Sequence, residues 1–194
     1  MNQMLQEAEP SQLATSQPQV PDGAGAPEAQ DTPPPAHPRF IKPQRVAFVQ
    51  AAWHREVVEE CRIAFLQEIE ARHITNVDLF EVPGSFEIPL HAQLLAKTRR
   101  YSAIVAAGLV VDGGIYRHEF VADTVIKALM DVQLRTEVPV FSAVLTPQQF
   151  HESAVHVEFF RKHFVIKGIE VAEACASTLH SLERLRGQVA AGIV

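Results

Sequence analysis

The stretch Ala103–Val111 reads AIVAAGLVV and contains no charged or hydrogen-bonding side chain. Asp112-Gly113-Gly114 follows it directly and ends the apolar run. A run of this length that is apolar on both faces is typical of a central strand in a parallel sheet, because helices cover both sides of such a sheet. The stretch therefore predicts an α/β domain built around this strand.

Strand and helix patterns alternate on both sides of this stretch. Further strands are expected at residues 45–51, 76–82 and 138–145, and helices at 55–72, 86–98, 118–135, 147–162 and 167–186. This alternation favours a parallel sheet with helices on both faces. We predict an α/β fold, a flavodoxin-like three-layer sandwich with a four-stranded parallel sheet.

The first 44 residues differ in composition from the rest of the 194-residue chain. They hold 9 of the 13 prolines and a single aromatic residue, Phe40. Such a segment buries too little apolar surface to offset the entropy lost on ordering. We therefore expect residues 1–44 to be a disordered, proline-rich leader and residues 45–194 to form one domain.

Composition and charge argue against several classes of protein. The net charge is −6 and no block of lysine or arginine occurs, which argues against a nucleic-acid partner. No uncharged apolar run of about 18 residues and no secretory signal pattern are present, which argues against membrane insertion and export. Cys61 and Cys175 are far apart in sequence and do not form a CxxC motif. We expect reduced, buried thiols in a cytoplasmic protein.

Common phosphate and metal motifs are absent. Gly108 and Gly113 have the spacing of a Walker A loop, but Gly114-Ile115 stands where that loop needs Lys followed by Ser or Thr. No HExxH occurs, and on a helix His151 and His156 would point about 140° apart. We therefore expect no metal and no cofactor.

Chemically useful side chains follow three of the expected strands. They are Trp53 and His54, then Ser85, Phe86 and Glu87, and then Gly113, Gly114, Arg117 and His118. The carboxyl ends of parallel strands lie at one edge of the sheet, where open α/β sheets bind ligands. Together the residues offer an aromatic face, an acid, an imidazole and helix amides that suit an anion. The pattern predicts a binding site at this edge and leaves the ligand open.

The segment Val82–Leu90 reads VPGSFEIPL and closely resembles the VPGAFEIPL segment of 6,7-dimethyl-8-ribityllumazine synthases. The order of motifs also agrees over residues 45–186, through a glycine turn with a histidine, VPV…VLT at 138–146 and Lys167-Gly168. The stretch GGIYRHEFVA at 113–122 resembles the branch of the family with decameric rather than capsid assemblies. Residues 1–44 lie outside the resemblance.

The resemblance implies the penultimate step of riboflavin biosynthesis. In that reaction, 5-amino-6-(D-ribitylamino)uracil condenses with 3,4-dihydroxy-2-butanone 4-phosphate to give 6,7-dimethyl-8-ribityllumazine, phosphate and water. It needs no metal or redox cofactor, and holding the two substrates together supplies much of the rate. Two alternatives stay open: a low-activity or inactive paralogue that binds flavin or lumazine, and an unrelated flavodoxin-like interaction module.

The resemblance also assigns residues to the substrates. It implies that Trp53 is an aromatic residue that stacks on the pyrimidine ring, and that Ser85, Phe86 and Glu87 contact the uracil and the ribityl chain. It also implies that Leu109, Val110 and Val111 form a wall beside the heterocycle, and that Ser142 makes another wall of the pocket more polar. Gly114 and Ile115 match the turn that binds phosphate. The proton-transferring histidine matches His118, with Arg117 as the alternative because the turn differs in length here. We favour His118, since an arginine does not give up its proton near neutral pH.

The resemblance does not identify a single phosphate-binding side chain, and it leaves the number of subunits in the assembly open. Counting from the two flanking motifs leaves His156 and Arg161 as candidates for the phosphate ligand, with Lys162 and His163 behind them. The resemblance implies a homopentamer, or two stacked pentamers, with each pocket between neighbouring subunits. Strand 138–145 and the 147–163 stretch of one chain would then complete the pocket of the next.

Overall fold

The computed structural model describes residues 37–114, 117–151 and 153–194. Most of the expected leader lies outside the described residues, as do Ile115, Tyr116 and Glu152. No helix among the described residues is long and apolar enough to cross a membrane.

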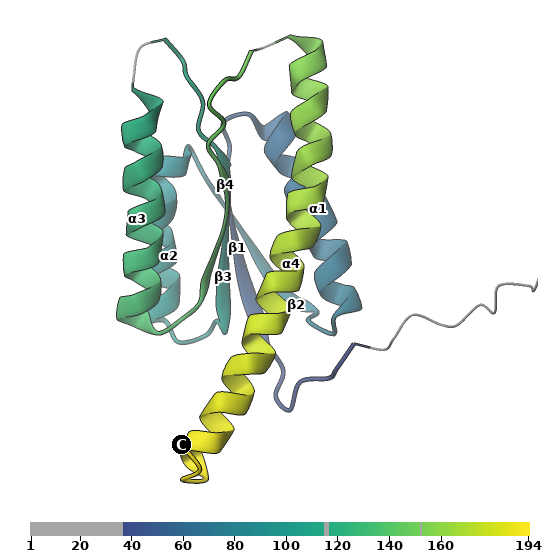
Figure 1. Ribbon diagram of the computed structural model, residues 1–194, viewed down its shortest axis with the longest axis vertical. Coiled ribbons are helices and arrows are strands. Elements are labelled where there is room, and N and C mark those ends of the chain that lie inside the picture. The colour runs from purple at the N-terminus through teal and green to yellow at the C-terminus, as the bar shows by residue number, and fades with distance from the viewer. Residues whose placement is uncertain (1–36, 115–116, 152) are drawn as a thin grey trace, which may run out of the picture. The chain divides into compact units, whose positions relative to one another are not determined.

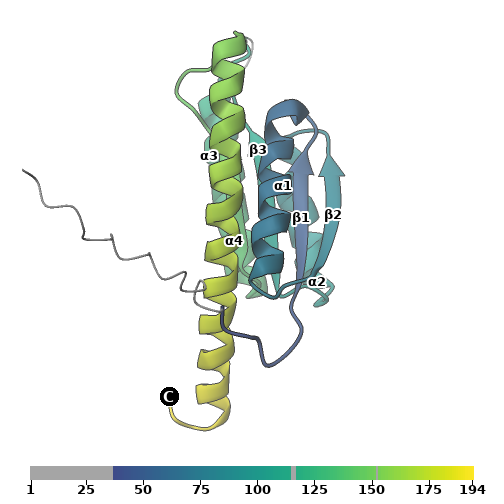
Figure 2. The ribbon, with the colours of Figure 1, turned by 90° about the vertical axis from the view of Figure 1, so that its right-hand side faces the viewer.

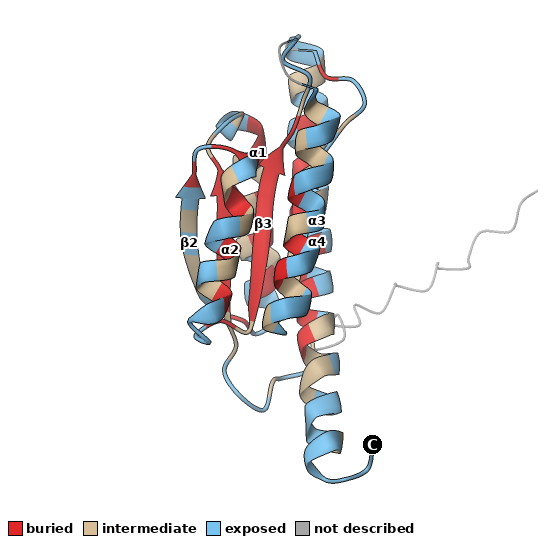
Figure 3. Ribbon diagram, turned by 90° about the vertical axis from the view of Figure 1, so that its left-hand side faces the viewer, coloured by how far each residue is buried: buried red, intermediate tan, exposed pale blue. Residues whose placement is uncertain are grey.

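Four parallel strands form one sheet in the order β2-β1-β3-β4 (Figure 1). They are β1 (Arg45–Ala51), β2 (Asn76–Val82), β3 (Ala103–Leu109) and β4 (Val140–Leu145). Every residue of β3 is buried (Figure 3), as the apolar stretch predicted. The predicted four-stranded parallel α/β fold is confirmed.

Two helices cover each face of the sheet (Figure 1). One face carries α1 (Arg55–Ala71) and α4 (Ala154–Ala190), and the other carries α2 (Ile88–Lys97) and α3 (His118–Thr136). Alternate residues of β1 serve the two cores: Val46 and Phe48 pack toward α1 and α4, whereas Ala47 and Val49 pack toward α2 and α3. The sheet therefore separates two apolar cores.

Two helix predictions were wrong in detail. The helix expected at 86–98 is a short 3-10 helix at Ser85–Glu87 followed by α2, which begins at Ile88 with a proline in its first turn. The helices expected at 147–162 and 167–186 are one continuous helix, α4, seen beside α1 in Figure 2. Gly168 does not break α4, because it lies where α4 packs closely against α1.

A polar cluster joins the amino ends of three strands. Asp78 of β2 accepts hydrogen bonds from Arg45 Nε and Nη2, at 2.8 and 3.0 Å, and from the Tyr101 hydroxyl at 2.7 Å. The Tyr101 hydrogen bond, with that of Arg45, lowers the pKa of Asp78. Burial and the same carboxylate raise the pKa of Tyr101. The cluster lies at the edge of the sheet opposite the helix starts that follow β1 and β3.

Candidate functional site

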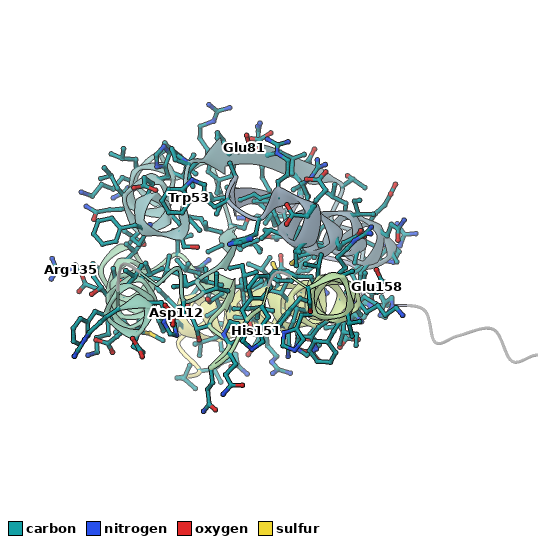
Figure 4. The ribbon with its side chains drawn as sticks, turned by 90° about the horizontal axis from the view of Figure 1, so that it is seen from above. Trp53, Glu81, Asp112, Arg135, His151 and Glu158 are labelled. Atoms are coloured by element: carbon teal, nitrogen blue, oxygen red, sulfur yellow. The ribbon has the colours of Figure 1, made fainter. Side chains whose placement is uncertain are left out.

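A cavity of about 270 Å³ opens at the carboxyl ends of the strands. Its lining residues come from the loops after β1, β2 and β3 and from the start of α3: Trp53, His54, Ser85, Phe86, Leu109, Val110, Val111, Gly113, His118 and Val121. Figure 4 views this edge of the sheet from above and labels Trp53 and Asp112. The structure therefore brings together most of the side chains that the sequence placed at the strand ends.

Trp53 presents a large aromatic face at the rim of the cavity. The Ala52 and Trp53 amides donate to the carbonyls of Val82 and Pro83, at 2.8 and 3.1 Å, so pairing between the chains continues past β1 and β2. The indole lies over Gly84, where an added Cβ would come within 2.9 Å of two ring carbons. Its side chain is 65% exposed, so one face is free to stack on a planar ligand.

Glu87 lies against the same glycine but outside the cavity lining. Its Oε2 accepts the Gly84 N–H at 2.9 Å, which fixes the turn between β2 and the 3-10 helix. Trp53 and Glu87 therefore both pack on Gly84. The expectation that Glu87 accepts from substrate hydroxyls stays a prediction.

Ser85 is a buried residue with an unpaired hydroxyl. Its Oγ has no hydrogen-bond partner among the described residues and lies against Gly108 of β3, where any Cβ would collide with it. A buried hydroxyl without a partner costs free energy. A ligand in the cavity that accepts or donates at this position would remove that cost.

His118 and Arg117 occupy different surroundings although they are adjacent in sequence. His118 is the first residue of α3, lines the cavity and has a side chain only 14% exposed, with Nδ1 3.7 Å from Glu119 Oε2. Arg117 is outside the lining, and its guanidinium lies over the Phe120 ring at 5.5 Å. The His118 imidazole is therefore placed to exchange a proton with a ligand in the cavity.

Leu109, Val110 and Val111 form an apolar wall that leads into the glycine turn. Gly114 has a φ of +73°, which favours glycine, and its amide donates to Asp112 Oδ1 at 2.8 Å. That amide is therefore already engaged within the turn. Ile115, the other residue expected at the phosphate, lies outside the described residues.

Three further site residues expected from the sequence do not line the cavity of the same chain. Ser142 is an exposed residue of β4, and His156 lies in the first turn of α4. Arg161 donates to Glu60 of α1 from Nε at 3.0 Å and from Nη2, and this carboxylate raises the pKa of Arg161. Within this chain, none of the three lines the cavity.

The expected separation of His151 and His156 was wrong. The His151 amide donates to His156 Nδ1 at 3.3 Å, and the two ring centroids are 5.2 Å apart. The reason is that α4 begins at Ala154, so His151 belongs to the preceding loop. In the part of the chain that the structure describes, no three His, Cys, Asp or Glu side chains are grouped as metal ligands.

Two lining residues, Val121 and His54, were given no function from the sequence. Val121 follows His118 by one helical turn of α3, a spacing that could have identified it. His54 was placed at the strand end without a function. The structure gives it a left-handed backbone conformation, with φ 54° and ψ 39°, that no local pattern indicated.

Comparisons with known proteins agree with one another. The family model for 6,7-dimethyl-8-ribityllumazine synthase matches residues 43–183. A protein of Bradyrhizobium diazoefficiens described as 6,7-dimethyl-8-ribityllumazine synthase 2 is 84% identical, covering 84% of this chain and 99% of the relative. A protein of the same description from Rhodopseudomonas palustris is 67% identical over 86% of this chain and 93% of its own. A 6,7-dimethyl-8-ribityllumazine synthase of Rhodococcus erythropolis is 60% identical over 75% and 95%.

Proposed function

This chain belongs to the 6,7-dimethyl-8-ribityllumazine synthase family, and we propose that the cavity at the carboxyl ends of β1 and β3 is where it carries out the family's reaction. The protein is a transferase that condenses 5-amino-6-(D-ribitylamino)uracil with 3,4-dihydroxy-2-butanone 4-phosphate. The products are 6,7-dimethyl-8-ribityllumazine, phosphate and water, in the penultimate step of riboflavin biosynthesis. The observation that carries the proposal is that Trp53, Ser85 and His118 line one cavity.

The uracil substrate is assigned to the Trp53 side of the cavity. The exposed indole stacks on the pyrimidine ring, and the apolar wall of Leu109, Val110 and Val111 covers its edge. The unpaired Ser85 hydroxyl gains a partner on the ligand. Glu87, which the structure places beside Trp53 on Gly84, accepts from the ribityl hydroxyls.

His118 is assigned the proton transfers. The uracil amine attacks the ketone and forms an imine with loss of water, phosphate is eliminated, and ring closure releases a second water. Each step moves a proton to or from nitrogen or oxygen, and a positioned imidazole can supply about 10²–10⁴-fold for such transfers. Because His118 begins α3, the first amides of that helix can face the departing phosphate.

We infer that the cavity is completed by a second copy of the chain. Ser142, His156 and Arg161 do not line the cavity of their own chain, which supports a role for them in the cavity of a neighbouring one. The helices α2 and α3 carry large exposed apolar side chains at helical spacing: Leu90, Leu94, Ile126, Met130 and Leu134. An apolar surface of this kind is typical of an interface between subunits. We propose a homopentamer, with two pentamers stacked as a decamer.

We also assign the protein to the cytoplasm. Cys61 and Cys175 are both free and buried, and burial raises the pKa of each thiol to about 12. Such thiols are protonated and unreactive, as expected of a protein that does not rely on disulfides.

The test is a direct assay of the purified full chain with both substrates. We expect a fluorescent lumazine product and stoichiometric release of phosphate, both lost below the concentration at which the oligomer dissociates. Tight binding of lumazine or flavin without turnover would instead support a binding protein. Sedimentation over the same concentration range gives the assembly state, and an active monomer would contradict the shared cavity.

A further inference from the structure

His54 has a strained backbone at the rim of the cavity and no assigned role. Its φ of 54° and ψ of 39° lie in the left-handed region, which residues other than glycine seldom adopt. Its carbonyl accepts the amides of Val57 and Val58 at 2.9 and 3.0 Å, so α1 starts from this turn. The His54 side chain makes no capping hydrogen bond to the helix.

The His54 ring links the cavity to the apolar core. It lines the cavity beside Trp53, and its centroid lies 5.3 Å from that of Phe150 in an edge-on arrangement. Phe150 is buried and packs in turn on Phe160 of α4, at 5.3 Å between centroids. A continuous series of ring contacts therefore runs from α4 to the rim of the cavity.

The backbone of Trp53 is held between two constraints. On one side, the hydrogen bonds from the Ala52 and Trp53 amides attach it to the end of β2. On the other side, the left-handed turn at His54 sets the direction of the chain as it enters α1. Between these two constraints, the indole lies over Gly84.

We propose that His54 is a positioning residue for Trp53: Phe150 holds the His54 ring, the ring stabilises the left-handed turn, and the turn fixes the indole over Gly84. The proposal rests on the proposed function for its kinetic readout, since a fixed indole is of use only to a ligand that stacks on it. A fixed aromatic face binds such a ligand without losing side-chain entropy at that moment.

Trp53 is the only tryptophan of the chain, so its fluorescence reports on this turn directly. The variants are His54→Asn, which tolerates the left-handed conformation but cannot reach Phe150, and Phe150→Leu. In both we expect a shifted emission and faster quenching by acrylamide. We expect the KM for the uracil substrate to rise about threefold to tenfold, the range of an aromatic contact, with kcat within about twofold. Phe80→Leu, a half-buried phenylalanine of β2 that packs edge-on to Tyr101 and lies outside this series of rings, is the matched control.

The double variant His54→Asn/Phe150→Leu tests whether the two residues act in series. We expect the KM of the double variant for the uracil substrate to be no higher than that of the more impaired single variant, because both changes break the same series of contacts. The proposal would be overturned if the effects of the two changes on the KM added up in the double variant, or if the Trp53 emission of His54→Asn were unchanged. His54→Asn alone decides if Phe150→Leu does not fold. If the wild-type protein makes no lumazine, the proposed function fails, while the emission comparison still tests the positioning role.

Discussion

Gly168 of α4 lies directly against the carbonyl oxygen of Cys61 on α1, so the two helices meet at their backbones. A Cβ at Gly168 would also lie 2.8 Å from Ala64 Cβ and 3.0 Å from the Phe65 amide nitrogen. Backbone atoms cannot move aside as a flexible side chain can, so the helices would have to separate. We expect Gly168→Ala to lower the free energy of unfolding by about 1–3 kcal/mol, the usual cost of overpacking. Urea denaturation at a fixed protein concentration measures it.

Gly187→Ala is the matched control on the same helix. Nothing lies within 4 Å of a Cβ at Gly187, which is exposed. Alanine has the higher helix propensity by about 1 kcal/mol, so this variant should be neutral or slightly more stable. Equal stability of the two variants would contradict the close packing at Gly168.

Gly168 also marks the limit of what the sequence could predict. Local periodicity identified all four strands, because each depends on apolar residues within a few positions. It could not recognise α4 as one helix, because the close contact that makes Gly168 acceptable involves α1, about a hundred residues earlier. The strand-end rule located Trp53, Ser85 and His118 together. Arg161 and Glu60 are 101 residues apart in sequence, so no local pattern indicated their ion pair. No local pattern indicated the left-handed turn at His54 either.

Removing the unpaired hydroxyl of Ser85 should separate stability from binding. Ser85→Ala deletes a buried group that has no partner among the described residues, so we expect the free energy of unfolding to stay the same or rise by up to about 1 kcal/mol. The same change should raise the KM for the uracil substrate about fivefold to tenfold, as the loss of one hydrogen bond would. A destabilised variant with unchanged KM would show that the hydroxyl serves the fold instead.

His118 and Arg117 can be distinguished by two alanine variants. His118→Ala removes the imidazole from the cavity, and we expect kcat to fall about 10²–10⁴-fold. Arg117→Ala removes a guanidinium that packs over Phe120 outside the cavity, so kcat should change less than about threefold. Single-turnover kinetics with saturating substrates measure the two effects. A larger fall in kcat for Arg117→Ala than for His118→Ala would assign the proton transfer to the turn that carries Arg117.

The hydrogen bonds to Asp78 should make the fold sensitive to acid. They lower the pKa of Asp78 in the folded chain from its ordinary 3.8. The stabilisation is therefore present above about pH 4 and is lost as the pH falls through the lowered value, where the folded chain finally takes up the proton. We expect Asp78→Asn to be less stable at pH 7 and to lose less stability between pH 4 and about pH 2.5 than wild type.

Tyr101→Phe is the companion variant, because the Tyr101 hydroxyl is the largest cause of the lowered pKa of Asp78. Without that donor, the pKa of Asp78 should move back toward its ordinary value, and the loss of stability in acid should be intermediate. Chemical denaturation at a series of pH values gives both slopes. An acid response in Asp78→Asn identical to that of wild type would place the sensitivity elsewhere.

The phosphate ligand can be identified by two alanine variants. Arg161 is engaged by Glu60, whereas the His156 ring contacts only the neutral His151 amide and nearby rings within the part of the chain that the structure describes. We therefore expect His156 to bind the phosphate in the shared cavity. His156→Ala should raise the KM for the butanone phosphate about fivefold to tenfold, as the loss of one hydrogen bond would, and Arg161→Ala should change it less than about twofold. Steady-state kinetics with the uracil substrate at saturation measure both values. A large rise in KM in Arg161→Ala, with little change in His156→Ala, would assign the phosphate to Arg161.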